Sequence, residues 1–417
     1  MKNKFINKYI MYISLIIIII FIIFIISYSY YIYNEKKHES FIGYSTMVKD
    51  IKYYRCKDKE LSPIMQNIFD SNNIINSNEN WDLYYPCGYN NIEQELKNIK
   101  INNSNIDNSN IYNINIDNIN IGSNKINEKF IFGINGCDEI VSKNNLWELI
   151  EKYYGREKAS TLIPESYILA DNSQIILLKN QFDYTKNNIY ILKKNLQRKE
   201  GLKLTRSLNE ILYAKFESYI IVQKYISDLY LINGRKVNLR IYVLIMIKNN
   251  IIYFYISKKG KCIYTNKQYN HDELDFETNI TSYNLDMSVY KENPRFFDEL
   301  IEYIDKHNGV GEGEKLFARI NNNLKDVFNC VADNMYQSNN IKGSTSFQLF
   351  GVDVIFNKNL EPFLLEFNKG PDMMPRDEID ANMKTIIQTD VFKKVGVLNN
   401  NHDNDNNSFY LVFSKNK

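Results

Sequence analysis

The sequence has 417 residues, enough for about two to three domains of ordinary size with a substantial hydrophobic core. Its 51 Lys and Arg residues and 49 Asp and Glu residues leave a net charge of only +2, which excludes a bulk electrostatic attraction to nucleic acid or to an acidic surface. The 5 cysteines include no Cys-x-x-Cys motif and no Cys/His cluster, which argues against a zinc site. We expect them to be reduced thiols with no shared role.

The N-terminal segment of the chain is strongly apolar. From Tyr9 to Tyr33 nearly every residue is apolar or aromatic and none is charged, which meets the requirement of about 20 residues for a helix that crosses a bilayer. Lysines precede this run and tyrosines gather at its end, as is typical of membrane interfaces. We predict a single-pass membrane anchor over residues 1–34. A cleaved signal peptide is the alternative, although its apolar region would be shorter and would be followed by small residues.

Two stretches of low complexity follow. Residues 90–127 are dominated by Asn and Ile; they alternate as a strand would, but their low complexity favours a disordered insertion. Residues 397–417 have a similar composition and are predicted to be a polar tail. Residues 35–89 are assigned to a linker and to the start of the globular region. We expect no chemistry in the insertion or the tail.

The sequence from Phe130 to about Gly396 mixes helical and strand-like patterns and is predicted to be a globular body of the α+β class. Runs rich in β-branched and aromatic residues predict strands at 189–192, 220–223, 237–247, 251–257, 347–356 and 363–368. Apolar residues at helical spacing predict helices over Lys143–Tyr154 and Lys315–Tyr336.

The last two predicted strands are separated by turn-forming residues, which predicts a hairpin. In this hairpin Asp353 falls nearly opposite Glu366, and the two-residue period of a strand puts Glu366 and Asn368 on one face. Three oxygen ligands then converge on an otherwise apolar sheet. Oxygen ligands in small number, with room left for water and phosphate oxygens, suit Mg²⁺ bound to a nucleotide. The alternative is that all three are ordinary polar residues facing solvent.

A second polar cluster lies in residues 235–240. Read as a strand, this segment places Lys236, Asn238 and Arg240 on one face and apolar residues on the other. Two cations with an amide between them suit a polyphosphate and a developing acyl phosphate, because a guanidinium can bind two oxygens at once. A solvated strand face explains the segment equally well when it is taken alone.

Together these segments resemble the tubulin-tyrosine-ligase-like family of ATP-grasp enzymes. The resemblance depends on the order of the motifs as much as on their content, and it covers roughly two thirds of the chain. In chain order the motifs are residues 81–84 (WDLY), 136–140 (GCDEI) leading to Lys143, 162–167 (LIPESY), 191–193 (ILK), 222–226 (VQKYI), 235–240 (RKVNLR), 350–353 (FGVD) and 365–368 (LEFN).

The resemblance implies an ATP-grasp fold with mostly antiparallel central sheets in residues 128–396. It also implies an ATP- and Mg²⁺-dependent ligase that forms an acyl phosphate and then an amide bond, a reaction that needs positioning and electrostatic stabilisation. Asp353, Glu366 and Asn368 would hold magnesium, and Arg240 and Lys236 would be catalytic. The implied ATP-binding residues are Lys143, Lys193, Gln223, Lys224, Tyr225, Ile226, Lys236 and Asn238, with residues 223–226 as the hinge that holds adenine through main-chain groups.

The resemblance further implies a free amino acid as one substrate and tubulin, or another protein with an acidic tail, as the acceptor. We expect no nucleic-acid partner and expect contact with a membrane through the N-terminal helix. Lys36 and Lys37 follow that helix, so the charge bias across it is small. We expect the catalytic body to be cytosolic because the proposed acceptor is found there.

Several departures from the family pattern leave two alternatives open. Lys193-Lys194 stands where the family commonly has Lys-Pro, and the glycine-rich turn that follows is reduced to residues 198–202. Asn238 replaces a common Asp. Lys261 takes the place of an arginine that often follows the glycine at position 260. A lysine cannot make the forked contact of an arginine. The chain is therefore also compatible with an inactive, anchored scaffold that binds tubulin or nucleotide, or with an ATP-grasp ligase that has a non-tubulin substrate.

Overall fold

The computed structural model describes residues 50–56, 59–78, 80–99, 128–196, 201–281, 284–399 and 406–417. Residues Ile51–Lys417 form one compact unit. The predicted membrane anchor, its signal-peptide alternative and most of the predicted Asn-rich insertion lie outside the described residues. Within the described ranges, no helix has both the length and the apolar character needed to span a bilayer.

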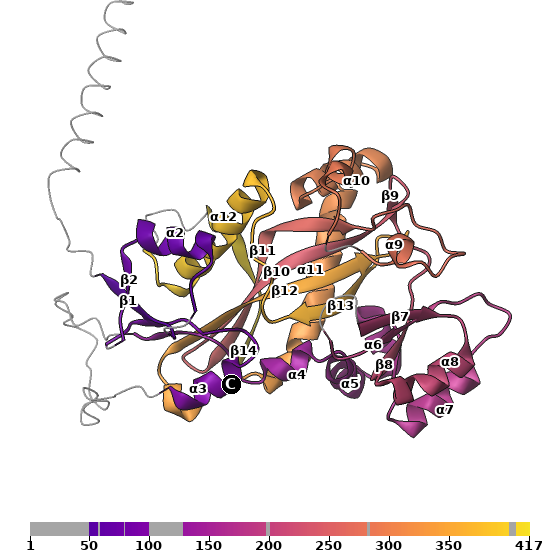
Figure 1. The fold of residues 1–417 in the computed structure, drawn as a ribbon, viewed down its shortest axis with the longest axis horizontal. Helices are drawn as coiled ribbons and strands as arrows, with labels where there is room; N and C mark the ends of the chain where they lie inside the picture. The colour runs from indigo at the N-terminus through magenta and orange to yellow at the C-terminus, as the bar shows by residue number, and fades with distance from the viewer. Residues whose placement is uncertain are drawn as a thin grey trace, which may run out of the picture. The chain divides into compact units, whose positions relative to one another are not determined.

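The centre of the unit is a large mixed sheet (Figure 1). In the part of the chain that the structure describes, it has 10 strands in the order β14-β11-β10-β12-β4-β3-β1-β2, with β13 paired to β12 and β9 to β10. The pairs among β9 to β14 are antiparallel, and those among β1 to β4 and between β4 and β12 are parallel. The strands are β1 (Ile51–Tyr54), β2 (Ile74–Asn76), β3 (Leu83–Tyr84), β4 (Phe130–Phe132), β9 (Leu231–Ile232), β10 (Arg235–Lys248), β11 (Ile251–Tyr264), β12 (Thr345–Phe356), β13 (Pro362–Asn368) and β14 (Phe409–Asn416).

Helices cover both faces of this sheet because its central strands are apolar on both sides. One face of β10 packs with α5 (Lys143–Tyr154), α10 (Phe297–Asn308) and α11 (Glu312–Val331), whose apolar residues recur at helical spacing. The opposite face packs with α2 (Pro63–Ser71) and α12 (Glu378–Val395). The remaining helices next to the sheet are α3 (Ile92–Asn98), α4 (Cys137–Val141), α6 (Arg156–Leu162) and α9 (Phe276–Asn279).

A second, smaller antiparallel sheet has the strand order β5-β8-β6-β7. Its strands are β5 (Ser166–Ile168), β6 (Tyr190–Lys193), β7 (Leu202–Thr205) and β8 (Ile221–Lys224), with α7 (Asn172–Gln181) and α8 (Leu208–Tyr213) packed on one side. On the other side, Ile191 and Leu204 share a cluster with Ile355 of β12 and with Leu365 of β13. The small sheet therefore lies against the β12–β13 hairpin (Figure 1).

Most of the predicted elements are confirmed. Each predicted strand of the globular body is present, all but β11 lie within two residues of their expected limits, and the sheets are mostly antiparallel. Helix α5 has the predicted limits, whereas α11 begins at Glu312 and ends at Val331, where a short 3-10 turn (η4, Ala332–Asn334) continues the chain. Strand β11 runs to Tyr264 because β10 pairs with it over nearly its whole length.

Two predicted boundaries are wrong. The segment after Leu398 is not only a polar tail, since Phe409–Asn416 forms β14 and pairs with β11 at the edge of the large sheet. The Asn-rich insertion does not begin at residue 90, since α3 occupies Ile92–Asn98. Ile92 and Leu96, one helical turn apart, bury against Ile131 and Ile341, so tertiary contacts outweigh the low local complexity.

The expectation of five reduced thiols is also wrong. Cys56 and Cys87 form a disulfide, while Cys137, Cys262 and Cys330 are free and buried. The two bonded cysteines are 31 residues apart in sequence. They meet because β1 and β3 are parallel neighbours, with Tyr54 paired to Tyr84, and each cysteine follows the end of its strand. No sequence motif signals this pairing.

Candidate functional site

The candidate site lies on the β12–β13 hairpin, where three neighbouring strands carry polar residues. Asp353 pairs with Glu366 across the hairpin, as predicted, and with Arg240 of β10 on its other side. The register between β12 and β13 shifts just after Asp353, which is a β-bulge. Bulges bend a strand and redirect its side chains, and they often occur beside functional sites.

Arg240 and Asp353 form a bidentate ion pair. Nε of Arg240 donates to Oδ1 of Asp353 at 2.5 Å, and Nη2 donates to Oδ2 at 3.1 Å. Burial by itself would lower the pKa of Arg240, but the carboxylate of Asp353 raises it above its ordinary value, so the guanidinium stays charged. A predicted catalytic residue and a predicted metal ligand are thus in direct contact, which the sequence did not indicate.

Glu366 is surrounded by cations. Nζ of Lys143, at the start of α5, is 3.7 Å from Oε2 of Glu366 and also donates to the carbonyl of Leu196 at 3.3 Å. The amide of Asn368 donates to Oε1 of Glu366 at 3.3 Å, which confirms that the two share a face. Burial favours the neutral acid, but Lys143, Lys193 and Arg240 together hold the pKa of Glu366 below its ordinary value. Glu366 is therefore a carboxylate.

Lys193 reaches the site from the small sheet. Its Nζ donates to Oε1 of Gln223 on β8 at 2.7 Å, and the Gln223 amide donates in turn to the hydroxyl of Ser166 at 3.0 Å. Burial lowers the pKa of Lys193 to about 8, with the positive charge of Lys143 adding to the shift while Glu366 and Asp353 oppose it. Lys193 and Gln223, both predicted from the resemblance, are thus brought together by the pairing of β6 with β8.

Lys236 and Asn238 are buried on β10, on the same strand face as Arg240. Nζ of Lys236 donates to the carbonyl of Asn279 at 2.8 Å and contacts the hydroxyl of Tyr225 at 3.1 Å. Burial lowers the pKa of Lys236 to about 7, and the charge of Lys193 adds to the shift. Asn238 donates to Thr281 at 3.1 Å, but its Oδ1 is buried without a hydrogen-bond partner.

The predicted adenine hinge is brought together only in part. Tyr225 is buried and its hydroxyl donates to the carbonyl of Asn279, while the side chain of Lys224 is exposed. The backbone N–H groups of Lys224 and Tyr225 donate to the carbonyls of Glu165 and Ile189. Those two N–H groups therefore cannot also donate to a base, and a main-chain donor from this part of the hinge would have to be the N–H of Ile226.

The site has an excess of positive charge. Lys143, Lys193 and Arg240 gather around Asp353 and Glu366, and Lys236 lies close enough to Lys193 for their charges to interact, so four basic residues and two acidic residues share a poorly solvated region. Burying unbalanced charge is costly, and the lowered pKa values of Lys193 and Lys236 reflect that cost. A polyphosphate would offset this charge, and the two carboxylates with Asn368 are hard oxygen ligands that suit Mg²⁺. The residues present therefore fit both groups.

The sequence analysis did not identify the residues that hold the side chains of Lys236 and Asn238 in place. The carbonyl of Asn279 and the hydroxyl of Thr281, which hold Lys236 and Asn238, lie in the connection after β11, and the high Asn content of the chain hides any signal there. Lys261 on β11 pairs with Arg240 and is 3.3 Å from Oδ1 of Asp380, a residue of α12. Burial lowers the pKa of Lys261 to about 8, with the charge of Lys384 adding to the shift.

A model of the tubulin-tyrosine ligase family matches residues 125–405 of the chain. This match covers more than half of the sequence and includes strands β4 to β13, which carry the candidate site. The chain therefore belongs to the tubulin-tyrosine ligase family, within the ATP-grasp superfamily, which confirms the resemblance predicted from its motifs.

Three relatives illustrate the similarity. The chain is 27% identical over 221 residues to the probable alpha-tubulin polyglutamylase Ttll1 of Tetrahymena thermophila, covering 50% of each protein. It is 23% identical over 244 residues to the probable tubulin polyglutamylase ttll-9 of Caenorhabditis elegans, covering 54% of this chain and 56% of the relative. It is 26% identical over 245 residues to tubulin glycylase 3B of Drosophila melanogaster, covering 55% and 32%. The chain thus spans about half the length, or less, of these curated relatives.

Proposed function

We propose that this protein is an ATP- and Mg²⁺-dependent carboxylate-amine ligase that adds an amino acid to a protein tail such as that of tubulin. The observation that carries the proposal is the excess of buried positive charge beside the Asp353, Glu366 and Asn368 set, where the large mixed sheet meets the small antiparallel sheet. The relatives with tubulin polyglutamylase and glycylase names support the choice of a tubulin tail as acceptor.

In the proposed reaction a carboxylate oxygen attacks the γ-phosphorus of ATP and ADP leaves. An amine then attacks the acyl carbon, the amide bond forms, and phosphate leaves as the amine gives up a proton. Lys143, Lys193 and Lys236 would bind phosphate oxygens, and the bidentate Arg240 would stabilise charge that develops on the transferred group. Mg²⁺, held by Asp353, Glu366 and Asn368, would neutralise phosphate charge.

The test is Mg²⁺-dependent ATP hydrolysis and acceptor modification by the purified full-length chain, supplied with amino acids and tubulin. We expect ADP release that requires magnesium and a mass increase of the acceptor equal to the added residue. Glu366→Gln removes a metal ligand and is expected to lower turnover by about 100-fold or more. The matched control is Glu302→Gln, an exposed residue of α10, which is expected to retain full activity.

Two results would redirect the proposal. Nucleotide binding without turnover would favour an inactive scaffold, the alternative suggested by the altered turn at residues 198–202. Magnesium-dependent turnover with a small-molecule acceptor but not with tubulin would favour a ligase of the same class with another substrate. Equal turnover by the wild type and Glu366→Gln would contradict the assigned metal set.

A further inference from the structure

The Cys56–Cys87 disulfide restrains a segment of the chain that lies outside the candidate site. The bond joins the residues that follow β1 and β3, so it fixes the start of residues 87–93, which lead into α3. The backbone N–H of Cys87 donates to Oε2 of Glu95 in α3 at 3.0 Å. The segment 87–93 is therefore held by the disulfide at one end and by α3 at the other.

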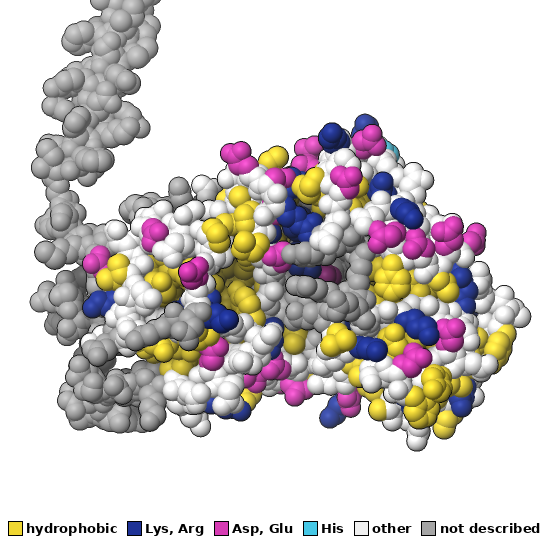
Figure 2. All heavy atoms as spheres, viewed as in Figure 1, with side chains coloured by type: hydrophobic (Ala, Val, Ile, Leu, Met, Phe, Trp, Pro, Cys, Tyr) yellow, Lys and Arg dark blue, Asp and Glu magenta, His cyan; other side chains and the backbone are white. Residues whose placement is uncertain are grey.

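A reductant would act at this one bond. The other three cysteines of the chain are free and buried, so there is no second disulfide to reduce. Cys56 and Cys87 are both partly exposed, which lets a small reductant reach them. Acidic and basic side chains are interspersed over the face shown in Figure 2, so a neutral dithiol is a suitable choice. The dithiol supplies two electrons and two protons, the S–S bond breaks into two thiols, and the dithiol becomes a disulfide.

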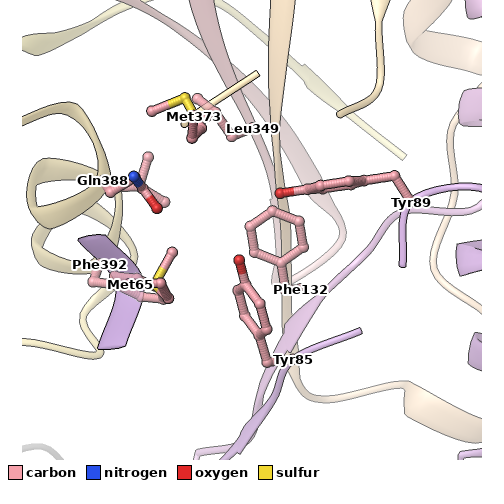
Figure 3. Close-up of a pocket in the computed structure, with 9 residues that line it drawn as sticks. Met65, Tyr85, Tyr89, Phe132, Leu349, Met373, Gln388 and Phe392 are labelled. Carbon is pink, nitrogen blue, oxygen red and sulfur yellow. The ribbon is translucent and has the colours of Figure 1, made fainter. Parts of the chain in front are cut away.

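Aromatic rings connect the segment 87–93 to the loop that follows β13. The rings of Tyr85 and Tyr89 contact Phe132 of β4, with centroids 5.2 and 6.1 Å away (Figure 3). A Cβ atom on Gly370 would lie 2.5 Å from Cγ of Tyr89, so the Tyr89 ring packs on the Gly370 backbone. Gly370 is two residues beyond Asn368, the last residue of β13 and a candidate metal ligand. The restrained segment thus packs against the chain next to the metal set.

Polar contacts hold the residue between Asn368 and Gly370 as well. Nζ of Lys369 donates to the carbonyl of Asn90 at 3.3 Å and forms an ion pair with Asp138 at the start of α4. Glu93 in turn accepts from the backbone N–H of Asp138 at 3.0 Å. The segment 87–93 therefore contacts the loop after β13 directly, through Asn90, and indirectly, through α4.

We propose that the Cys56–Cys87 bond is a redox-sensitive restraint on the metal-binding end of β13. With the bond formed, the segment 87–93 holds the loop after Asn368 in place; with the bond reduced, the loop opens more often and Mg²⁺ with nucleotide binds more weakly. Contacts that orient metal ligands change metal affinity by about 10- to 100-fold when they are lost. The identity of the ligand rests on the proposed function, whereas the link between the bond and the loop does not.

The first test measures hydrogen–deuterium exchange by mass spectrometry on the ligand-free full-length chain, before and after reduction with dithiothreitol. We expect the amides of residues 366–373 to exchange at least about 3-fold faster in the reduced chain, because local opening becomes more frequent. Exchange in α10, which packs on the opposite face of the large sheet, is expected to stay the same. The double variant Cys56→Ser with Cys87→Ser should resemble the reduced wild type whether or not dithiothreitol is present.

The second test measures the dissociation constant of AMP-PNP, an ATP analogue, with Mg²⁺ and with EDTA. Reduction is expected to weaken the Mg²⁺ complex by about 10-fold and the metal-free nucleotide by less than about 2-fold, because the loop adjoins the metal ligands. Tyr89→Ala removes the ring from Gly370 while keeping the bond, and should weaken the Mg²⁺ complex of the oxidised chain. Tyr184→Ala, at a position that is 78% exposed, is the matched control and should bind as the wild type does.

The comparison of oxidised with reduced wild type needs no variant, so a variant that does not fold leaves the test intact. Unchanged exchange of residues 366–373 on reduction, equal Mg²⁺-nucleotide affinity of the two forms, or two free thiols at Cys56 and Cys87 in the oxidised chain would overturn the proposal. Failure of both forms to bind nucleotide would contradict the proposed function and the metal part of this proposal, while faster exchange on reduction would still establish the restraint.

Discussion

Lys193 and Lys236 are ammonium groups held where little water reaches them. Both are buried, and the charge of Lys193 lowers the pKa of Lys236 further. Their hydrogen bonds to Gln223 and to the carbonyl of Asn279 only partly replace hydration. A site of this kind binds anions well because the protein has already met the cost of removing water from the cations.

The buried charge of Lys236 makes the stability of the protein depend on pH. The folded pKa of Lys236 is about 7, below the ordinary value of about 10.4 for an unfolded chain. Below pH 7 both states are protonated and the full cost of burying the charge is present. Between pH 7 and about 10 the unfolded state binds more protons, so this lysine makes the free energy of unfolding rise with pH.

We therefore expect Lys236→Met to have a smaller rise in the free energy of unfolding between pH 7 and pH 9 than the wild type, by about 1–2 kcal/mol. Urea unfolding at the two pH values measures this difference. Lys258→Met, at an exposed position of β11, should follow the wild-type pH dependence. Parallel pH profiles for the wild type and Lys236→Met would show that Lys236 stays charged throughout this range.

At the scale of the elements, α12 is unusual because polar residues lie on its buried face. Asp380, Lys384 and Gln388 follow each other at one-turn spacing and are all buried. Lys384 is 2.9 Å from Asp380 and donates to the carbonyl of Met374 at 2.6 Å, while Asp380 accepts from the backbone N–H of Arg376. The helix thereby holds the loop that follows β13, on which Pro371 lies against the candidate site.

The Asp380 and Lys384 pair is expected to be strongly coupled. Asp380→Asn leaves two lysines without their shared carboxylate and should cost about 3–5 kcal/mol of stability, as for a broken buried pair. The double variant with Lys384→Met should cost at least about 1 kcal/mol less than the sum of the two single changes. Chemical denaturation of the four proteins measures this coupling. Additive costs would argue that the pair contributes little to holding the loop.

Strand β14 completes the edge of the large sheet although its sequence resembles a polar tail. Phe409 is 1% exposed within the core that α12 covers, whereas Leu411 is 51% exposed. Phe409→Ala should therefore lower the free energy of unfolding by about 3–5 kcal/mol. Leu411→Ala on the same strand, the matched control, should change it by less than about 1 kcal/mol. Similar small effects for both would mean that β14 is not a stable part of the sheet.

For the whole molecule, the predicted anchor and the location of the globular unit are linked questions. Removal of residues 1–34 should release the chain from the membrane fraction into the soluble fraction, as carbonate extraction and immunoblotting would detect. A chain that stays soluble with residues 1–34 intact would contradict the anchor. Protease protection then reports the side of the membrane, and exposure of the globular unit on the cytosolic side is expected.

The Cys56–Cys87 disulfide offers a second measure of that location. Disulfides persist in oxidising compartments and are rare in the cytosol. Thiol labelling before and after reduction, on protein taken directly from cells, reports whether the bond is present. A disulfide found in cells, together with a protected globular unit, would overturn the predicted cytosolic location.

The sequence by itself determined the strands β6, β8 and β10 to β13, the α5 helix, the hairpin that pairs Asp353 with Glu366, and the family. These features depend on local periodicity, on turn chemistry and on the order of motifs, all of which are contained in short segments. The tertiary structure decided the rest: the Arg240–Asp353 ion pair, the burial of Lys236, its contact with the carbonyl of Asn279, the Cys56–Cys87 bond and the inclusion of β14. Each of these features joins residues that are distant in sequence. Their contacts form, and water is removed from around their side chains, only once the two sheets and α12 are packed together.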